Sequence, residues 1–367
     1  VGDEAGTAIT TGDQNVLIGY AAGDAITTAS DNTAVGYNNL ANNTSGQKNV
    51  ALGSRSMQAN TTGYGNTAAG YQSLTANTEG LFNVAVGQEA LLGATTASSN
   101  TALGYQSQYT TTTGGSNTSV GRGALFSNTT GSTNVSIGYH SLLVNTTGAS
   151  NVAVGGNALD ANTTGDFNIA VGLNALGANT TADYNTATGH HSLKLNTTGS
   201  ENAGFGSFSL QANTEGASNA GFGYQALDAN TTGDSNVAVG RDALLSNTTA
   251  DNNNALGMSA GYSTTTGHSN NFMGRNAGYS NTTGSSNTGL GHNALNSNTT
   301  SSGNTAVGYQ AGYSQTTASG GSSSFFGYQA GYSLTGLFCT FVGGQAGYSA
   351  TSGQSNTFVG HFAGGNV

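Results

Sequence analysis

The side chains of this 367-residue chain that could carry out acid–base or metal chemistry are few and widely separated. Histidine can serve as a general base or a metal ligand, but such sites need partners at short spacing. No histidine pairs with a cysteine or carboxylate in this way, and most stand at the same places of an internal repeat: His140, His190, His191, His268, His292 and His361. We therefore expect the histidines to occupy variable surface positions.

Other catalytic and cofactor signatures are equally weak. The Gly-x-Gly match that begins at Gly204 is a product of the repeat and not a phosphate loop. Acidic residues cluster loosely at two repeat positions without the Gly-Asp pattern of calcium-binding β-rolls, for example Asp160, Asp166, Asp228 and Asp234. The sequence thus predicts no enzyme, no metal site and no cofactor.

A 17-residue repeat determines where every side chain must lie. Its marker glycine recurs without a slip from Gly2 to Gly308 and then at Gly327, Gly343 and Gly360. The consensus is N-T-A-V-G-Y-Q-A-L-x-A-N-T-T-G-x-x, and repeat positions are numbered from its first Asn. A short fixed period predicts one small unit stacked on its copies. We expect regular repeats over residues 1–308 and an irregular, aromatic-rich continuation over 309–367.

The repeat is too short for a helical hairpin and poor in helix formers, with 59 Gly in the chain. Thr-Ala-Val at positions 2–4 suits a short strand, and a second strand is expected at Ala-Leu-x-Ala, with Asn-Thr-Thr-Gly as a corner. The predicted fold is an all-β parallel β-solenoid (β-roll) of about 21 coils. At about 4.8 Å per coil it would be a rod on the order of 100 Å long.

Stacking predicts two ladders of identical polar side chains, since each repeat position lies above itself in the next coil. Asn at position 1 would form one ladder, which includes Asn32, Asn49, Asn66, Asn83, Asn100, Asn151, Asn168, Asn236 and Asn304. Thr at position 13 would form the other, which includes Thr44, Thr61, Thr129, Thr163, Thr231 and Thr282.

Apolar side chains at position 4 are expected to face the core of the coil, so that position 3 faces outward. Position 3 changes to Phe near the C-terminus, which predicts an oligomer contact through Phe272, Phe325, Phe341 and Phe358. Where position 9 loses Leu, position 10 usually gains Tyr, as at Gly278-Tyr279, and we expect that ring to fill the vacated core.

Charge and composition exclude several partners. The net charge is −10 with six Lys plus Arg, which argues against nucleic acid and anionic membranes. No segment has the roughly 20 apolar residues of a membrane span. The chain begins and ends within a repeat, so a longer protein is expected.

Two periodic features suggest other roles. Position 12 forms Asn-x-Ser/Thr sequons that would accept N-linked sugar in a eukaryotic secretory setting: Asn60, Asn128, Asn145, Asn162, Asn179, Asn196, Asn230, Asn247, Asn281 and Asn298. The regular threonine rows are reminiscent of ice-binding solenoids, although Glu79 and Glu215 interrupt one of the rows.

The Asn-Val-Ala-Val-Gly core, as at Asn151 to Gly155, resembles the head repeats of trimeric autotransporter adhesins, and Asn304 to Ala311 is similar to repeats of phage tail-fibre-like proteins. The first resemblance implies a left-handed β-roll in a trimer. We expect an extracellular structural fibre segment, on a cell surface or a virion, whose partners are copies of itself, as a trimer or filament, and a cell-surface or glycan receptor. The alternatives are a glycan-coated fibril and an ice- or carbohydrate-binding solenoid.

Overall fold

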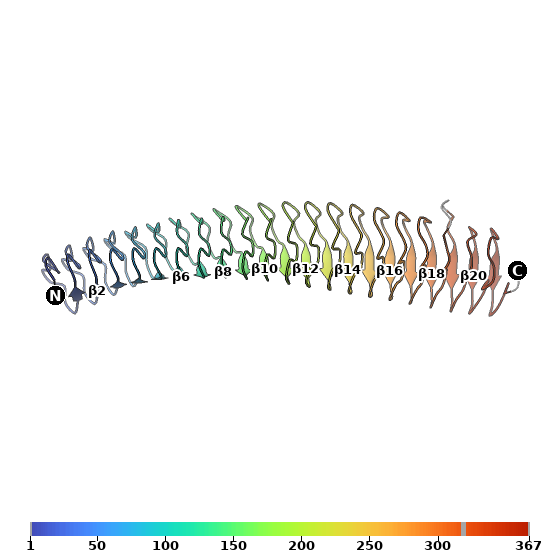
Figure 1. The fold of residues 1–367 in the computed structure, drawn as a ribbon, viewed down its shortest axis with the longest axis horizontal. Helices are drawn as coiled ribbons and strands as arrows, with labels where there is room; N and C mark the ends of the chain where they lie inside the picture. The colour runs from blue at the N-terminus through green and yellow to red at the C-terminus, as the bar shows by residue number, and fades with distance from the viewer. Residues whose placement is uncertain (1, 317–320, 366–367) are drawn as a thin grey trace. The chain divides into compact units, whose positions relative to one another are not determined.

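The chain is an all-β parallel β-solenoid in which one three-residue strand recurs about every 17 residues. The computed structural model describes residues 2–316 and 321–365, and these contain 21 strands and no helix. They fall into two compact units, Val1–Tyr184 and Asn185–Val367, within each of which successive coils lie side by side (Figure 1). The predicted fold class is confirmed.

The strands cover repeat positions 2–4 in both units. The first unit holds β1 (Val16–Ile18), β2 (Thr33–Val35), β3 (Val50–Leu52), β4 (Thr67–Ala69), β5 (Val84–Val86), β6 (Thr101–Leu103), β7 (Thr118–Val120), β8 (Val135–Ile137), β9 (Val152–Val154) and β10 (Ile169–Val171). The second holds β11 (Thr186–Thr188), β12 (Ala203–Phe205), β13 (Ala220–Phe222), β14 (Val237–Val239), β15 (Asn254–Leu256), β16 (Asn271–Met273), β17 (Thr288–Leu290), β18 (Thr305–Val307), β19 (Ser324–Phe326), β20 (Thr340–Val342) and β21 (Thr357–Val359).

Neighbouring strands of a unit pair in parallel with every repeat position opposite itself, as in the alignment of Val135 with Val152. The same register continues through β18, β19 and β20, where the repeat spacing becomes irregular. The separate organisation predicted for residues 309–367 stays a prediction, and its residues 317–320 and 366–367 lie outside the described part of the chain.

The expected second strand at Ala-Leu-x-Ala is wrong, because the backbone there is not extended. Positions 7 and 9 adopt positive φ, as at Asn38 (50°) and Leu40 (52°), and this curls the chain into consecutive turns. These turns still hydrogen-bond to the next coil, since Leu40 N–H donates to the Ser56 carbonyl at 3.1 Å. Adjacent coils are therefore joined around their circumference, not only along the strands.

The prediction that position 4 faces the core and position 3 faces outward is also wrong. Position 3 is buried, as at Ala34, Ala153 and Phe272 (all 0% exposed), whereas position 4 faces solvent, as at Val86 (39%). The proposed outward phenylalanines are core residues: Phe272, Phe325 and Phe341 are fully buried, and Phe358 is half-buried and stacks on Phe341 at 4.8 Å. They cannot form the predicted oligomer contact.

These phenylalanines fill the space that Leu leaves at position 9. A Cβ built on Gly278 would lie 2.4 Å from the Phe272 ring, and a Cβ on Gly331 would lie 2.4 Å from Phe325. The tyrosines of position 10 therefore do not enter the core as predicted. They remain half-buried at the surface and stack on one another, as Tyr262 does on Tyr279 at 4.9 Å.

The marker glycine at position 5 is required by its backbone. Gly155 has φ of 137°, and a Cβ there would lie 2.5 Å from the carbonyl oxygen of Gly172 in the next coil. Neither the angle nor the stacking distance accommodates another residue type. The spacing between coils thus depends on this glycine.

Substitution of Gly155 by Ala should lower the free energy of unfolding by at least about 3 kcal/mol, because it adds backbone strain to a clash with Gly172. The matched control is the adjacent Gly156, where an added Cβ meets only the Leu173 side chain at 3.3 Å. Gly156→Ala should change stability by less than about 0.5 kcal/mol. Equal denaturation midpoints for the two variants would contradict this account.

Phe272→Ala should destabilise the chain by about 3–5 kcal/mol through a core cavity. Gly278→Leu in the otherwise unchanged chain should destabilise it by overpacking against the same ring. Combined, the two changes should recover more than half of the loss, since Leu at position 9 fills this space elsewhere. A denaturant-based double-mutant cycle measures the coupling, and additive losses would refute it.

Candidate functional site

The centre of most coils is a polar network that closes the coil on itself, although position 12 is not Asn in some coils, as at Ile26 and Ala94. In the coil that begins at Asn151, the carbonyl of Gly165 accepts a hydrogen bond from Asn151 Nδ2 at 2.8 Å and another from Asn162 Nδ2 at 3.0 Å. Both asparagines are fully buried. One carbonyl at position 15 thus joins positions 1 and 12 across the interior.

The same asparagines link each coil to its neighbours. Asn151 Oδ1 accepts the backbone N–H of Asn168 at 2.9 Å and its Nδ2 at 3.2 Å, and Asn162 Nδ2 donates to Asn145 Oδ1 at 2.8 Å. The predicted asparagine ladder at position 1 is therefore present, together with a second ladder at position 12. Buried amides satisfied in this way stabilise the fold, whereas unpaired ones would destabilise it.

The threonine ladder at position 13 uses the backbone as acceptor. The hydroxyl of Thr163 donates to the carbonyl of Thr180 at 3.0 Å, and that of Thr44 donates to the carbonyl of Thr61 at 3.2 Å. These threonines are half-buried or exposed, while Thr164 at position 14 is exposed. Ice binding by the threonine rows stays a prediction.

Burial contradicts the proposed N-linked sugars. The side-chain amide nitrogen is the atom that would carry the sugar, and in every candidate sequon the asparagine is fully buried. That nitrogen also donates to the position-15 carbonyl of its own coil, as Asn60 does to Gly63 at 3.1 Å. The correction applies to Asn60, Asn128, Asn145, Asn162, Asn179, Asn196, Asn230, Asn247, Asn281 and Asn298.

Titratable side chains do not converge on a reaction centre. Among the described residues no three His, Cys, Asp or Glu side chains are grouped to hold a metal ion. Burial raises the pKa of Asp160 and of Asp228, which lie at position 10 four coils apart. Burial and the neighbouring His190 lower the pKa of His191. Each shift arises from local surroundings and not from a shared site.

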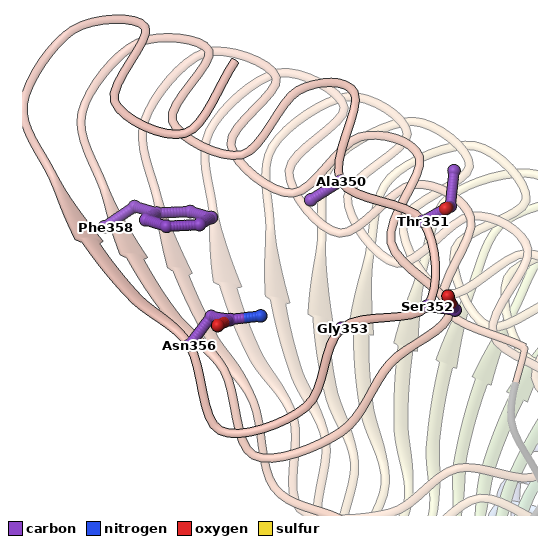
Figure 2. Close-up of a pocket in the computed structure, with 6 residues that line it drawn as sticks. All are labelled: Ala350, Thr351, Ser352, Gly353, Asn356 and Phe358. Carbon is purple, nitrogen blue, oxygen red and sulfur yellow. The ribbon is translucent and has the colours of Figure 1, made fainter. Parts of the chain in front are cut away.

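A cavity of about 330 Å³ opens at the last coils and has no ionisable side chain in its lining. Phe358 and Asn356 point into it from the strand side, opposite a turn that closes the other side (Figure 2). The lining residues are Ala350, Thr351, Ser352, Gly353, Asn356 and Phe358. It is the coil interior seen end-on, with core and ladder residues around it, and it offers no nucleophile–base pair.

The outer face of the sheet carries a row of exposed apolar side chains at position 4. The row is between 37% and 46% exposed at Val86, Leu103, Ile137 and Val171 in the first unit, and at Phe205, Phe222, Leu256, Met273, Leu290, Phe326 and Val342 in the second. Exposed apolar surfaces of this kind mark contacts with other molecules, although Thr188 interrupts the row. We call it the apolar row.

Aromatic side chains at position 6 line one side of the apolar row. Tyr20 stacks on Tyr37 with ring centroids 5.5 Å apart, and Tyr309 stacks on Tyr328 at 5.4 Å. Arg122 lies 5.9 Å and 5.7 Å from the rings of Tyr105 and Tyr139. Because stacked rings cover each other's faces, these residues present edges and hydroxyl groups to the outside.

Sequence reasoning missed the apolar row because it placed position 4 inside the coil. One signal could have revealed the true facing. Each Phe at position 3 is followed six residues later by Gly, as in Phe272 with Gly278 and Phe341 with Gly347. Phe therefore occupies position 3 only where position 9 has lost its Leu, and this indicates that the two positions share one space in the core.

No helix among the described residues is long and apolar enough to cross a bilayer. No known protein-family model matches the chain, and no curated protein is significantly similar to it. The candidate site therefore rests on geometry, and this places it on the outer surface of the coils.

Replacement of Asn162 by Asp tests the buried network. The change preserves shape but removes the donor to Gly165 and Asn145 and buries a charge, so the free energy of unfolding should fall by about 3 kcal/mol or more. Asn252→Asp is the control, because Asn252 is exposed and Asp31 occupies the same repeat position. It should change stability by less than about 0.5 kcal/mol. Similar losses in both variants would contradict the assigned role.

Proposed function

We propose that the chain is a segment of an extracellular structural fibre, on a cell surface or a virion, with a mechanical role and no catalysis. The proposal rests on what the buried side chains in the interior of the coils do. The buried amides of positions 1 and 12 bond within the coil and to neighbouring coils, as Asn151 and Asn162 do. The interior side chains therefore hold the coils together, and we infer that they do not act on a substrate.

The same bonding supports a load-bearing role. Adjacent coils are joined at the strand, at the turns and at three ladders of side chains, so a coil cannot separate without losing many hydrogen bonds at once. Repeat arrays built from such nearest-neighbour contacts suit extended, protease-resistant structures.

Copies of the chain are the proposed partners, and the apolar row is the proposed contact. An exposed row of Val, Leu, Ile, Phe and Met side chains favours burial against another surface. The resemblance to adhesin heads and tail fibres agrees with self-association. A cell-surface or glycan receptor is proposed for the outer positions that vary between repeats.

Immunogold electron microscopy with antibodies raised against the recombinant chain tests the fibre role. We expect label on extended appendages of the source cells or particles, and none after the antibodies are absorbed with the recombinant chain. Label confined to the interior of cells would contradict an extracellular fibre.

A further inference from the structure

Charged side chains in the second unit are segregated on the two sides of the apolar row. The acidic edge consists of positions 16 and 17, just before each strand, and the basic edge of positions 6 and 7, just after it. The acidic edge carries the exposed Glu201, Asp234 and Asp251, together with His268. The basic edge carries the exposed Arg241, Arg275 and His292, together with His190, His191, Asp242 and His361.

Three residues on each edge have the same spacing. On the acidic edge, Asp234 stands two coils after Glu201, and Asp251 stands one coil after Asp234. On the basic edge, Arg275 stands two coils after Arg241, and His292 one coil after Arg275. The second pattern begins three coils later than the first, which corresponds to about 14 Å along the stack.

Two of the three carboxylates of the acidic edge are held by the backbone, and that of Glu201 accepts a hydrogen bond from the Ser218 hydroxyl at 3.2 Å. Asp234 Oδ1 accepts the N–H of Ala217 at 2.7 Å, and Asp251 Oδ1 accepts the N–H of Asp234 at 2.8 Å. On the basic edge, Arg241 pairs with Asp242 at 3.1 Å, whereas Arg275 forms no ion pair within the described chain. The acidic pattern is thus a fixed feature of the surface, and its counterpart includes an unpaired cation.

We propose that a second copy of this chain docks beside the second unit, parallel to it and offset by three coils, with the acidic edge of one copy against the basic edge of the other. Glu201, Asp234 and Asp251 then face Arg241, Arg275 and His292. This contact rests on the proposed fibre role and specifies how copies associate. An antiparallel neighbour would instead bring like edges, and so like charges, together.

The first unit supports the same offset with the signs exchanged at one pair. Three coils separate Asp13 on its acidic edge from Arg55 on its basic edge, and also Lys48 from Glu89. Lys48 is a base on the acidic edge and Glu89 is an acid on the basic edge, so the two side chains still have opposite charges. With no offset, Asp13 would face Asp3 and Glu4 of the neighbouring copy.

A rival offset is less favourable. A shift of two coils in the opposite direction pairs Asp166 with Arg122, Lys48 with Asp3 and Glu4, and Asp183 with His140 in the first unit, and Asp234 with His190 and His191 in the second. It leaves both arginines of the second unit, Arg241 and Arg275, beside uncharged residues. In the three-coil arrangement the one like-charged approach within a unit is Glu201 to Asp242, which already pairs with Arg241. The three-coil offset is favoured because it alone of the two places both Arg241 and Arg275 opposite carboxylates, those of Glu201 and Asp234.

The apolar row lies between the edges, so a contact that joins the edges of two copies also covers part of the row. A shallow groove of about 300 Å³ marks this stretch of the outer face in the second unit. Its lining is almost entirely apolar and consists of Val237, Val239, Asn254, Ala255, Leu256, Asn271 and Met273. The charges would set the register, and the apolar side chains would supply most of the affinity.

Charge reversal tests the contact by sedimentation velocity over a concentration series at low salt. The wild-type chain should self-associate, and both the acidic-edge variant (Glu201→Lys, Asp234→Lys, Asp251→Lys) and the basic-edge variant (Arg241→Glu, Arg275→Glu) should associate at least about tenfold more weakly. A mixture of the two variants, or one chain with all five changes, should recover association. Circular dichroism confirms that each variant is folded. Lack of recovery in folded variants would overturn the proposal.

Disulfide trapping tests the offset in a Cys339→Ser background. Ser235→Cys with Asn276→Cys places thiols on facing edges at the three-coil offset, and this pair should cross-link between chains in preference to the controls. Gln225→Cys replaces Asn276→Cys as the control for no offset, and His191→Cys replaces it for the rival offset. Preferential cross-linking of either control pair would overturn the three-coil register.

The two proposals fail separately. A wild-type chain that stays monomeric at every concentration overturns the staggered contact but leaves the immunogold result for the fibre role unaffected. Intracellular label would refute the fibre role even if the purified chain associates as described.

Discussion

The structure depends on the closure of most coils by two asparagines that donate to one carbonyl. Asn151 and Asn162 reach Gly165 from opposite sides of the interior, and their oxygens then accept hydrogen bonds from the following coil. A coil of about 17 residues is too small to bury many large apolar side chains. Hydrogen-bonded amides lie beside a small apolar core of Ala and Leu, and they favour a constant repeat period because most of them bond to the same position of a neighbouring coil.

This closure divides the molecule into an invariant interior and a variable exterior. Side chains at positions 1, 3, 8, 9 and 12 are buried, where they pack or form hydrogen bonds. Ala at positions 3 and 8 and Leu at position 9 are the commonest apolar residues among them. Position 5 keeps its glycine, position 13 keeps its threonine and position 15 is mostly buried, while the outward-facing positions 4, 6, 7, 16 and 17 vary in charge, size or aromaticity. Any recognition must therefore use extended rows of surface side chains, and the apolar row with its two charged edges is the most organised of these.

The period, the β class, the parallel stacking and the position-1 and position-13 ladders could all be predicted from the sequence, because each follows from the identity and spacing of residues along the chain. The facing of positions 3 and 4 could not. Val is larger and more apolar than Ala, so burial by hydrophobicity alone favours Val inside. The narrow interior, already occupied by Leu at position 9 and two amides, accepts only a methyl group at position 3. Phe enters there only where Gly replaces Leu, as at Phe272 beside Gly278.

By itself, the sequence determined that identical side chains stack on one another, since a strict 17-residue period allows no other arrangement of a β-structure. Only the tertiary structure decided which of those rows are internal. Positive φ at positions 7 and 9 turns the chain where a second strand was expected, and in the folded coil the sequon asparagines lie inside while the position-4 side chains lie outside. Such backbone angles arise from packing against neighbouring coils, so they are not encoded in local propensity.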